Sequence, residues 1–250
     1  MESLVYLIPL FFLTALLYST VGFGGGSTYL ALLVLFSVPY TEMPKVALAC
    51  NIVVVAGGCY FFIRAGYFSL RKVLPFIVTS IPAAYLAGSV TIGKAVFMWL
   101  LFISLAVAGL RMLLSEHSFK VRKEVTWSQA WLVGLPIGAL LGALSGLVGI
   151  GGGIFLAPVL LLLGWAHAKE VAAAASFFIL VNSAAGLLGQ FSKGAWLVEL
   201  GFLIPLLVAV FLGGQIGSRL GSGAFSKVAL QRLTAVLILF VSGRLLWGLL

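Results

Sequence analysis

Two glycine clusters are the residues in this chain that are best suited to bind a ligand. The sequence reads Val-Gly-Phe-Gly-Gly-Gly over residues 21–26 and Val-Gly-Ile-Gly-Gly-Gly over residues 148–153. A glycine run interrupts a helix and lets backbone N–H groups approach a ligand closely. The helix that restarts after it presents unpaired N–H donors and partial positive charge. The clusters therefore predict an anion-binding site, with tight packing between helices as the alternative.

Neutral polar side chains inside the apolar runs could complete such a site. Amides and hydroxyls donate hydrogen bonds to an anion without carrying charge. Their alternative role is to join helices within a membrane, and we assign that role to Gln190 and Gln215. The candidate substrate-binding residues are Gly22, Gly24, Gly25, Gly26, Ser27, Asn51, Gly149, Gly151, Gly152, Gly153, Ser176, Asn182 and Ser183.

Other kinds of chemistry are excluded by what the apolar runs lack. The chain has no Asp, and its six Glu lie near the ends of apolar runs or in connections. A cation site in a membrane would need such carboxylates, so their absence from the runs favours an anion. No carboxylate pair, metal-ligand cluster or nucleophile–histidine spacing is visible, so we expect neither an enzyme nor a metal site. Neither cluster is followed by Gly-Lys-Ser/Thr, which excludes a phosphate loop, and no cofactor is expected.

The composition indicates which elements must position these residues. The chain is 62% hydrophobic and 8% charged, with a mean hydropathy of +1.22. Soluble globular chains are about a quarter charged, so we predict an all-α integral membrane protein that lies in a lipid bilayer. The net charge of +9 does not indicate a nucleic-acid partner, because the lysines and arginines lie between apolar runs, as in membrane proteins.

The apolar runs divide the chain into two similar halves. The two glycine clusters stand 127 residues apart, and each is followed by an unusually short run. This pattern predicts a first membrane repeat over 1–114, a cytoplasmic linker over 115–128 and a second membrane repeat over 129–250. The runs cover roughly 4–21, 26–39, 45–63, 73–91, 95–114, 130–148, 154–165, 170–190, 197–217 and 228–250.

The positive charges predict how the two halves are oriented. If the loop 111–125 is cytoplasmic and all ten runs cross, most lysines and arginines fall inside. Short runs that dip in and return are the alternative, and they fit the charges less well. Five crossings in each half make the halves antiparallel, which is the inverted-repeat plan of many secondary transporters. We therefore expect two inverted repeats with glycine-broken short helices at mid-membrane.

The glycine motifs give the chain a resemblance to the TauE/SafE family of membrane proteins. The family's GxGGGxxxxPxL signature is complete over residues 149–160, whereas Ala31 replaces the proline in the first half. The resemblance implies that the chain exports a small sulfur-containing anion, sulfite or an organosulfonate, by alternating access between the repeats. It also implies a multi-pass protein of a prokaryotic cell (inner) membrane. A passive anion channel of similar architecture is the alternative, and a homo-oligomer is left open.

Overall fold

The apolar runs form helices in the computed structural model of the chain. The structure describes residues 2–20, 22–114, 127–162, 168–194, 198–220, 236, 238–243 and 245–247. In these residues all regular structure is α-helical, as predicted, and no strand occurs. Most of the predicted linker 115–128 and the beginning of the last run, 228–250, lie outside the described residues.

Most of the described helices follow the apolar runs within a few residues. Five of them are long and apolar enough to cross a membrane, and α1 and α5 are apolar as well. The helices are α1 (Glu2–Ser19), α2 (Gly26–Leu35), α3 (Met43–Arg64), α4 (Leu70–Ser89), α5 (Lys94–Leu114), α6 (Trp127–Val148), α7 (Gly153–Leu162), α8 (Ala168–Phe191) and α9 (Leu200–Leu220). The five long ones are α3, α4, α6, α8 and α9.

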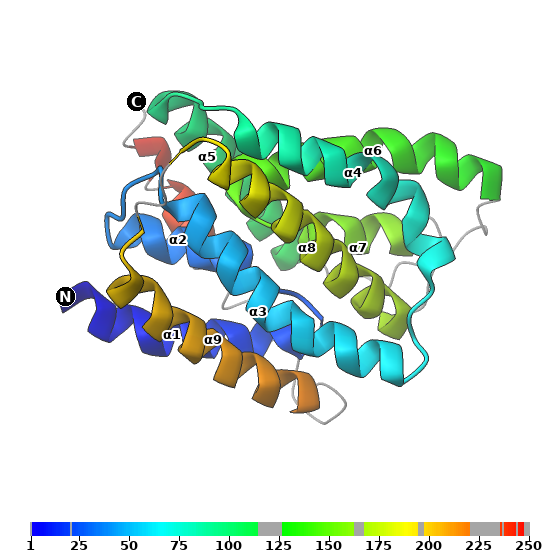
Figure 1. Cartoon of the computed structure of the whole chain (residues 1–250), viewed down its shortest axis with the longest axis horizontal. Helices are drawn as coiled ribbons and strands as arrows, with labels where there is room; N and C mark the ends of the chain where they lie inside the picture. Colours follow the sequence, from blue (N-terminus) through cyan, green and yellow to red (C-terminus); the bar gives the residue numbers. More distant parts are fainter. Residues whose placement is uncertain are drawn as a thin grey trace.

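The two helices that follow the glycine clusters are too short to cross a membrane alone. Helices α2 and α7 have ten residues each, which gives each a length of about 15 Å. The hydrocarbon core of a bilayer is about twice as thick. Figure 1 shows α2 running back towards the side of the molecule on which α1 begins, and α3 starts on that side. The pair α1–α2 therefore reaches inward and returns to the side on which α1 begins. Helix α3 starts on that same side, which is also where it would start if α1 and α2 both crossed the membrane.

The helix contacts repeat between the two halves. Helix α1 packs against α9, and its counterpart α6 packs against α4. In the same way α3 packs against α9 and α8 against α4, while α3 and α8 pack against each other. Figure 1 shows α3 and α8 running in opposite directions along the centre of the molecule. These pairings support the predicted duplication, and the inverted orientation of the halves in a membrane stays a prediction.

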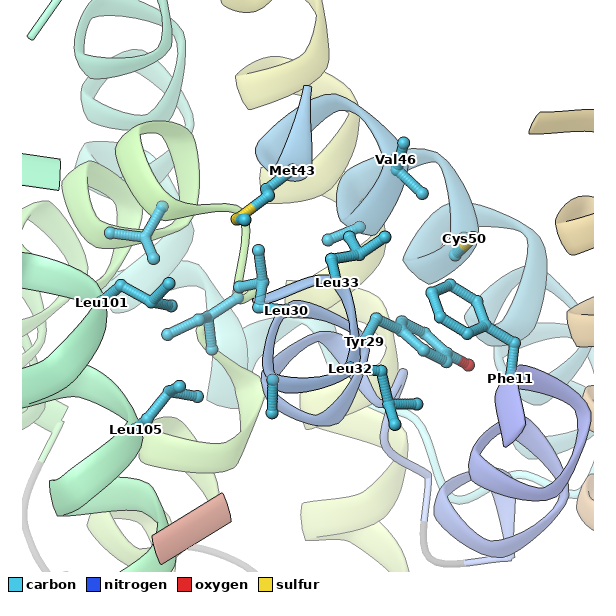
Figure 2. Close-up of a cluster of buried hydrophobic side chains, with 14 of the residues drawn as sticks. Phe11, Tyr29, Leu30, Leu32, Leu33, Met43, Val46, Cys50, Leu101 and Leu105 are labelled. Atoms are coloured by element: carbon cyan, nitrogen blue, oxygen red, sulfur yellow. The ribbon is translucent and has the colours of Figure 1, made fainter. Parts of the chain in front are cut away.

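The short helix α2 is embedded in the core of the first half. Tyr29 on α2 stacks against Phe11 on α1, with ring centroids 4.6 Å apart. Figure 2 shows Tyr29, Leu30 and Leu33 of α2 surrounded by side chains of α1, α3 and α5. This packing fixes the start of α2, and with it the first glycine cluster, in the interior of the protein.

Glycines allow a close contact between α6 of the second half and α4 of the first half. Gly134, Gly138, Gly142 and Gly146 recur every four residues and so lie along one face of α6. Side chains at these positions would overlap α4; a Cβ on Gly142, for example, would overlap the backbone of Ser80. Small residues on one face let two membrane helices approach closely, which is the role of this glycine row.

Large apolar side chains point outwards along the same helices. On α9, the residues at four-residue spacing that remain about half exposed or more are Leu200, Ile204, Val208 and Leu212. An exposed apolar face this continuous is unfavourable in water and is expected where a helix meets lipid tails. The outer faces of the helices therefore fit the predicted bilayer environment.

We predict that Gly142→Ala destabilises the protein, whereas Gly93→Ala does not. A methyl group at position 142 overlaps the backbone of α4, while nothing lies within 4 Å of a Cβ at position 93. Overpacking of this kind costs about 1–3 kcal/mol. Thermal unfolding in detergent should show a lower melting temperature for the first variant alone. Equal melting temperatures for the two variants would contradict the assigned role of the glycine row.

A second prediction concerns orientation in the membrane. In a background with Cys50 and Cys59 replaced, a cysteine placed at Lys120 should react with an impermeant thiol reagent from one side only. Cysteines placed near residues 2 and 247 should react from the opposite side, because the two halves are predicted to be antiparallel. If all three positions react from the same side, the inverted arrangement is wrong.

Candidate functional site

The first glycine of each cluster ends a helix. Gly22 has a φ of +80°, and its N–H donates to the Ser19 carbonyl 3.2 Å away at the end of α1. Gly149 has a φ of +93°, and its N–H donates to the Ser145 carbonyl 2.9 Å away at the end of α6. Glycine adopts this left-handed conformation without strain and commonly terminates helices in this way. The predicted interruption of both helices is therefore present.

A second glycine of each cluster starts the following short helix. Gly25 (φ +92°) precedes α2, and Gly152 (φ +72°) precedes α7. In each case its carbonyl accepts hydrogen bonds from the N–H groups three and four residues further on. The two clusters thus share their geometry at both positions, although Ala31 stands where the second half has Pro158. They differ at the middle glycine, because Gly151 has a positive φ and Gly24 does not.

Each cluster leaves backbone donors unpaired. The N–H groups of Gly24, Gly25 and Gly26 have no hydrogen-bond partner among the described residues. The same holds at the second cluster for the N–H groups of Gly151 and Gly152. Unpaired donors at the start of a helix, together with the helix dipole, favour a bound anion. Both clusters therefore have the backbone geometry that was predicted for anion binding.

The two clusters meet at the side chain of Asn51 on α3. Its Nδ2 atom faces the carbonyl oxygens of Gly149 and Ile150, at 3.4 Å from each. On the other side, a Cβ on Gly24 would lie 2.5 Å from Asn51 Oδ1, and one on Gly26 would lie 2.6 Å from Nδ2. Asn51 is fully buried. This amide therefore contacts the first cluster and bonds, through long hydrogen bonds, to the second.

Helix α8 forms the opposite wall of the site. Ile179 stands 128 residues after Asn51 in the sequence, and its Cγ2 atom would lie 3.0 Å from a Cβ on Gly151. One turn further on, Ser183 Oγ would lie 3.4 Å from the same Cβ. Ser176 donates a 2.7 Å hydrogen bond to the Gly22 carbonyl. The site is thus lined by a polar side chain on the α3 side and by both polar and apolar side chains on the α8 side. The two sides differ although the halves are predicted to be repeats.

Three buried polar atoms beside the clusters have no hydrogen-bond partner in the described part of the chain. They are Asn51 Oδ1, Ser183 Oγ and Tyr29 OH. The Tyr29 hydroxyl belongs with the site because it would lie 3.1 Å from a Cβ on Gly25. Burying a polar atom without a partner is unfavourable, and such atoms call for an explanation. A polar ligand held between the clusters would supply the missing hydrogen bonds.

The remaining predicted residues are buried but are placed differently. Ser27 lies in the first turn of α2, next to the first cluster. The Asn182 Nδ2 atom donates to the Phe178 carbonyl, so its hydrogen bond stays within α8. Gln190 donates to the Gly146 carbonyl at 2.8 Å and joins α8 to α6, as expected for a residue that links helices. The described residues contain no group of three His, Cys, Asp or Glu that could hold a metal ion.

One functional candidate was missed by the sequence reasoning. Tyr29 lies four residues after Gly25, and its hydroxyl returns to that glycine because residues one helical turn apart share a face. The signal was present in the sequence, since Tyr29 lies one helical turn after Gly25 and carries a polar group directly after Ser27 and Thr28.

Comparison with known proteins gives one consistent result. The family model described as "Sulfite exporter TauE/SafE" matches residues 7–245. The chain is 35% identical over 242 residues to a protein of Sinorhizobium fredii named "Probable membrane transporter protein y4hK", covering 95% of this chain and 96% of that protein. It is 25% identical over 265 residues to "Probable membrane transporter protein YunE" of Bacillus subtilis, covering 95% of each chain. No solved structure matches the chain.

Proposed function

Because the chain belongs to the TauE/SafE family, we propose that this membrane transporter exports a small sulfur-containing oxyanion, sulfite or an organosulfonate, from the cytoplasm. We place it as a multi-pass protein in the inner membrane of a prokaryote. The observation that carries the proposal is the convergence of two glycine-broken helices on one buried amide. The family and the names of both relatives describe transporters, and the site adds the chemistry of the ligand.

The donors at the glycine breaks suit an anion. Backbone N–H groups of both clusters lie at the starts of α2 and α7, where the helix dipoles add partial positive charge. The hydroxyls of Ser183 and Tyr29 can each donate one further hydrogen bond. No carboxylate is among the side chains that contact the clusters in the described residues. An anion would therefore exchange its water shell for neutral donors that are already in place.

Asn51 favours a protonated form of the substrate. Its NH2 group faces two backbone carbonyls, and this orients the amide so that Oδ1 is the atom without a hydrogen-bond partner. An oxygen acceptor repels a fully deprotonated oxyanion but accepts a hydrogen bond from one that still carries an O–H group. A monoanion such as hydrogen sulfite has both the oxygens and the O–H. The proton would then cross on the substrate, and no carboxylate relay is needed.

Alternating access fits the way in which the halves contact each other. The contacts between the halves are formed by α3 with α8, and by the pairs α1–α9, α4–α6, α3–α9 and α4–α8. The site lies at the α3–α8 contact, so a movement of one half against the other would expose it on alternate sides. The rival, a passive channel, needs no such movement.

Counterflow in proteoliposomes tests the function directly. Vesicles loaded with unlabelled sulfite should take up labelled sulfite from outside transiently, and vesicles loaded with chloride should not. A carrier exchanges substrate in this way, because each labelled ion that enters replaces one that leaves. Uptake that depends only on the gradient of the labelled ion would indicate a channel, and no sulfur oxyanion flux at all would refute the proposed substrate.

We predict that Asn51→Asp abolishes this counterflow while Asn182→Asp reduces it far less. A carboxylate at position 51 would lie next to the bound anion, and two unit charges 4 Å apart repel by about 4 kcal/mol at an effective dielectric constant of 20. That repulsion corresponds to a loss in affinity of more than about a hundredfold. Asn182 is the matched control, because it is equally buried and also has an unpartnered Oδ1, but its Nδ2 bonds within α8 and its side chain is not among the nearest neighbours of the cluster glycines. Equal losses in both variants, at equal amounts of inserted protein, would show that Asn51 is not at the site.

A further prediction concerns an ion pair that links the halves. Lys72 on α4 and Glu170 on α8 form a salt bridge of 2.8 Å, and the two side chains belong to different repeats. Under alternating access this contact should break in each cycle, so Lys72→Glu or Glu170→Lys alone should change the counterflow rate several-fold. The double variant restores opposite charges and should recover most of the rate. Additive losses in the double variant would show that the pair does not act between the halves.

A further inference from the structure

Two side chains contact both glycine clusters, and one of them is apolar. The middle glycines of the clusters, Gly24 and Gly151, share Asn51 and Ile179 as nearest neighbours. A Cβ on Gly24 would lie 2.5 Å from Asn51 Oδ1 and 3.3 Å from the Ile179 methyl carbon Cγ2. A Cβ on Gly151 would lie 2.8 Å from Asn51 Nδ2 and 3.0 Å from the same methyl carbon. A ligand held by the backbone of both clusters would therefore lie against these two side chains.

The side chain of Ile179 has little freedom to move away from the clusters. It is 3% exposed, and its Cγ1 and Cδ1 atoms would each lie 2.5 Å from a Cβ on Gly153, the first residue of α7. A β-branched side chain in a helix also has one strongly preferred rotamer. Its Cγ2 methyl group is therefore a fixed apolar surface at the middle glycines.

Three sets of polar groups accompany this methyl group. Two sets are the unpaired N–H groups of the first and of the second cluster, with the Ser183 hydroxyl beside the second. The third set is the amide of Asn51, whose Oδ1 atom is buried without a partner in the described part of the chain. Ile179 brings neither a donor nor an acceptor. A ligand oxygen that faced Ile179 would therefore lack a hydrogen bond.

This division suits an anion that has three oxygens. Sulfite and sulfonate groups have three oxygens on sulfur, and their fourth corner holds a lone pair or a carbon atom. Sulfate and phosphate hold an oxygen at that corner as well. When three oxygens bond to the two clusters and to Asn51, the fourth corner faces Ile179. An oxygen at that corner would lose its water without gaining a hydrogen bond, which is unfavourable.

We propose that Ile179 determines the specificity of the site, because it admits oxyanions with three oxygens and disfavours tetrahedral anions with four. The inference rests on the proposed function for the class of ligand, and it assigns the selection to one side chain of α8. A hydrophobic wall rejects a ligand of equal shape that adds a hydroxyl by up to about a hundredfold. Selection of that size distinguishes sulfite from sulfate.

A matched pair of ligands tests the fourth corner without a change of charge. In mildly acidic buffer, methylphosphonate and phosphate are both monoanions with an O–H group, and they differ by a methyl or a hydroxyl at one corner. Calorimetry with the full-length protein in nanodiscs should show that methylphosphonate binds about ten- to a hundredfold more tightly. Sulfite and sulfate form the second pair, in which sulfite should bind more tightly. Equal affinities within either pair would overturn the inference.

A matched pair of variants assigns the selection to Ile179. Asparagine and leucine have similar shapes, but only asparagine offers an NH2 donor to a fourth oxygen. Ile179→Asn should therefore reduce both affinity ratios by about tenfold, and Ile179→Leu should retain them. The charge of each ligand is the same in every variant, so a change in the ratio reports the contact with residue 179. Equal ratios in the two variants would show that Ile179 only packs between the helices.

A milder pair of variants keeps the test decisive if Ile179→Asn does not insert into the membrane. Threonine and valine also have similar shapes, and only threonine carries a hydroxyl. Ile179→Thr should reduce the preference for sulfite over sulfate several-fold relative to Ile179→Val. Melting temperatures in the same nanodiscs identify the folded variants, and the sulfur pair alone decides if neither phosphorus anion binds.

The outcomes separate this inference from the proposed function. Sulfite that binds no more tightly than sulfate would overturn the role of Ile179 and leave the proposed function intact. A preference for methylphosphonate that Ile179→Asn removes, without any binding of sulfite, would retain the role of Ile179 and refute the proposed substrate. An equal loss of affinity for all four anions in Ile179→Asn would assign the residue to packing and overturn the inference. No binding of any of the four anions would refute both.

Discussion

The fold depends on how a membrane protein satisfies the backbone N–H and C=O groups at a helix break, which have no hydrogen-bond partner within a helix. In hydrocarbon an unpaired N–H is unfavourable by several kcal/mol, so broken helices persist only where protein or a polar ligand surrounds the break. Here the two breaks face each other across α3 and α8. Asn51 donates to the carbonyls of the second cluster, and Ser176 donates to the Gly22 carbonyl of the first. The carbonyls are therefore partly satisfied by protein, and the N–H groups are the ones left for a ligand.

The two predicted repeats share one pattern of helix contacts, but the side chains that they bring to the glycine clusters differ. Asn51 on α3 and Ile179 on α8 both contact the glycine clusters, although one side chain is polar and the other is apolar. An amide on each helix would give a symmetric polar cage, whereas Ile179 makes part of the α8 wall apolar beside Ser183. A small oxyanion with one protonated oxygen is itself asymmetric, and it matches a site with an acceptor on one side and donors on the others.

Much of the fold could be predicted from the sequence, because apolar runs and glycine breaks are local signals. The helix breaks and the short helices after them follow from the two motifs alone, whereas the φ angle of each glycine does not, because Gly24 and Gly151 differ. The orientation of Asn51 could not be predicted, because its partners lie 98 and 99 residues away and depend on how the halves pack. Asn182 shows the opposite case. Residues 176, 179 and 183 share one face of α8. Residue 182 is rotated by about 100° around the helix from Ser183, so helix geometry alone could have separated the two.

Substitution of the cluster glycines would change the backbone and the packing as well as any contact with a ligand. Gly25 and Gly152 have positive φ angles, so alanine would strain the backbone whatever the ligand does. A Cβ on Gly26 would also lie 2.5 Å from the Ile150 carbonyl oxygen, so the contact that brings the breaks together is itself a packing contact. The side chains around the breaks differ in this respect. Ser183 holds an unpartnered hydroxyl, whose removal relieves a cost in the empty protein and loses a bond in the loaded one, whereas a change of Asn51 would also remove its bonds to Gly149 and Ile150. A ligand at this site should therefore be detected as opposite changes in the stability and the affinity of a Ser183→Ala variant, a pattern that packing residues do not produce.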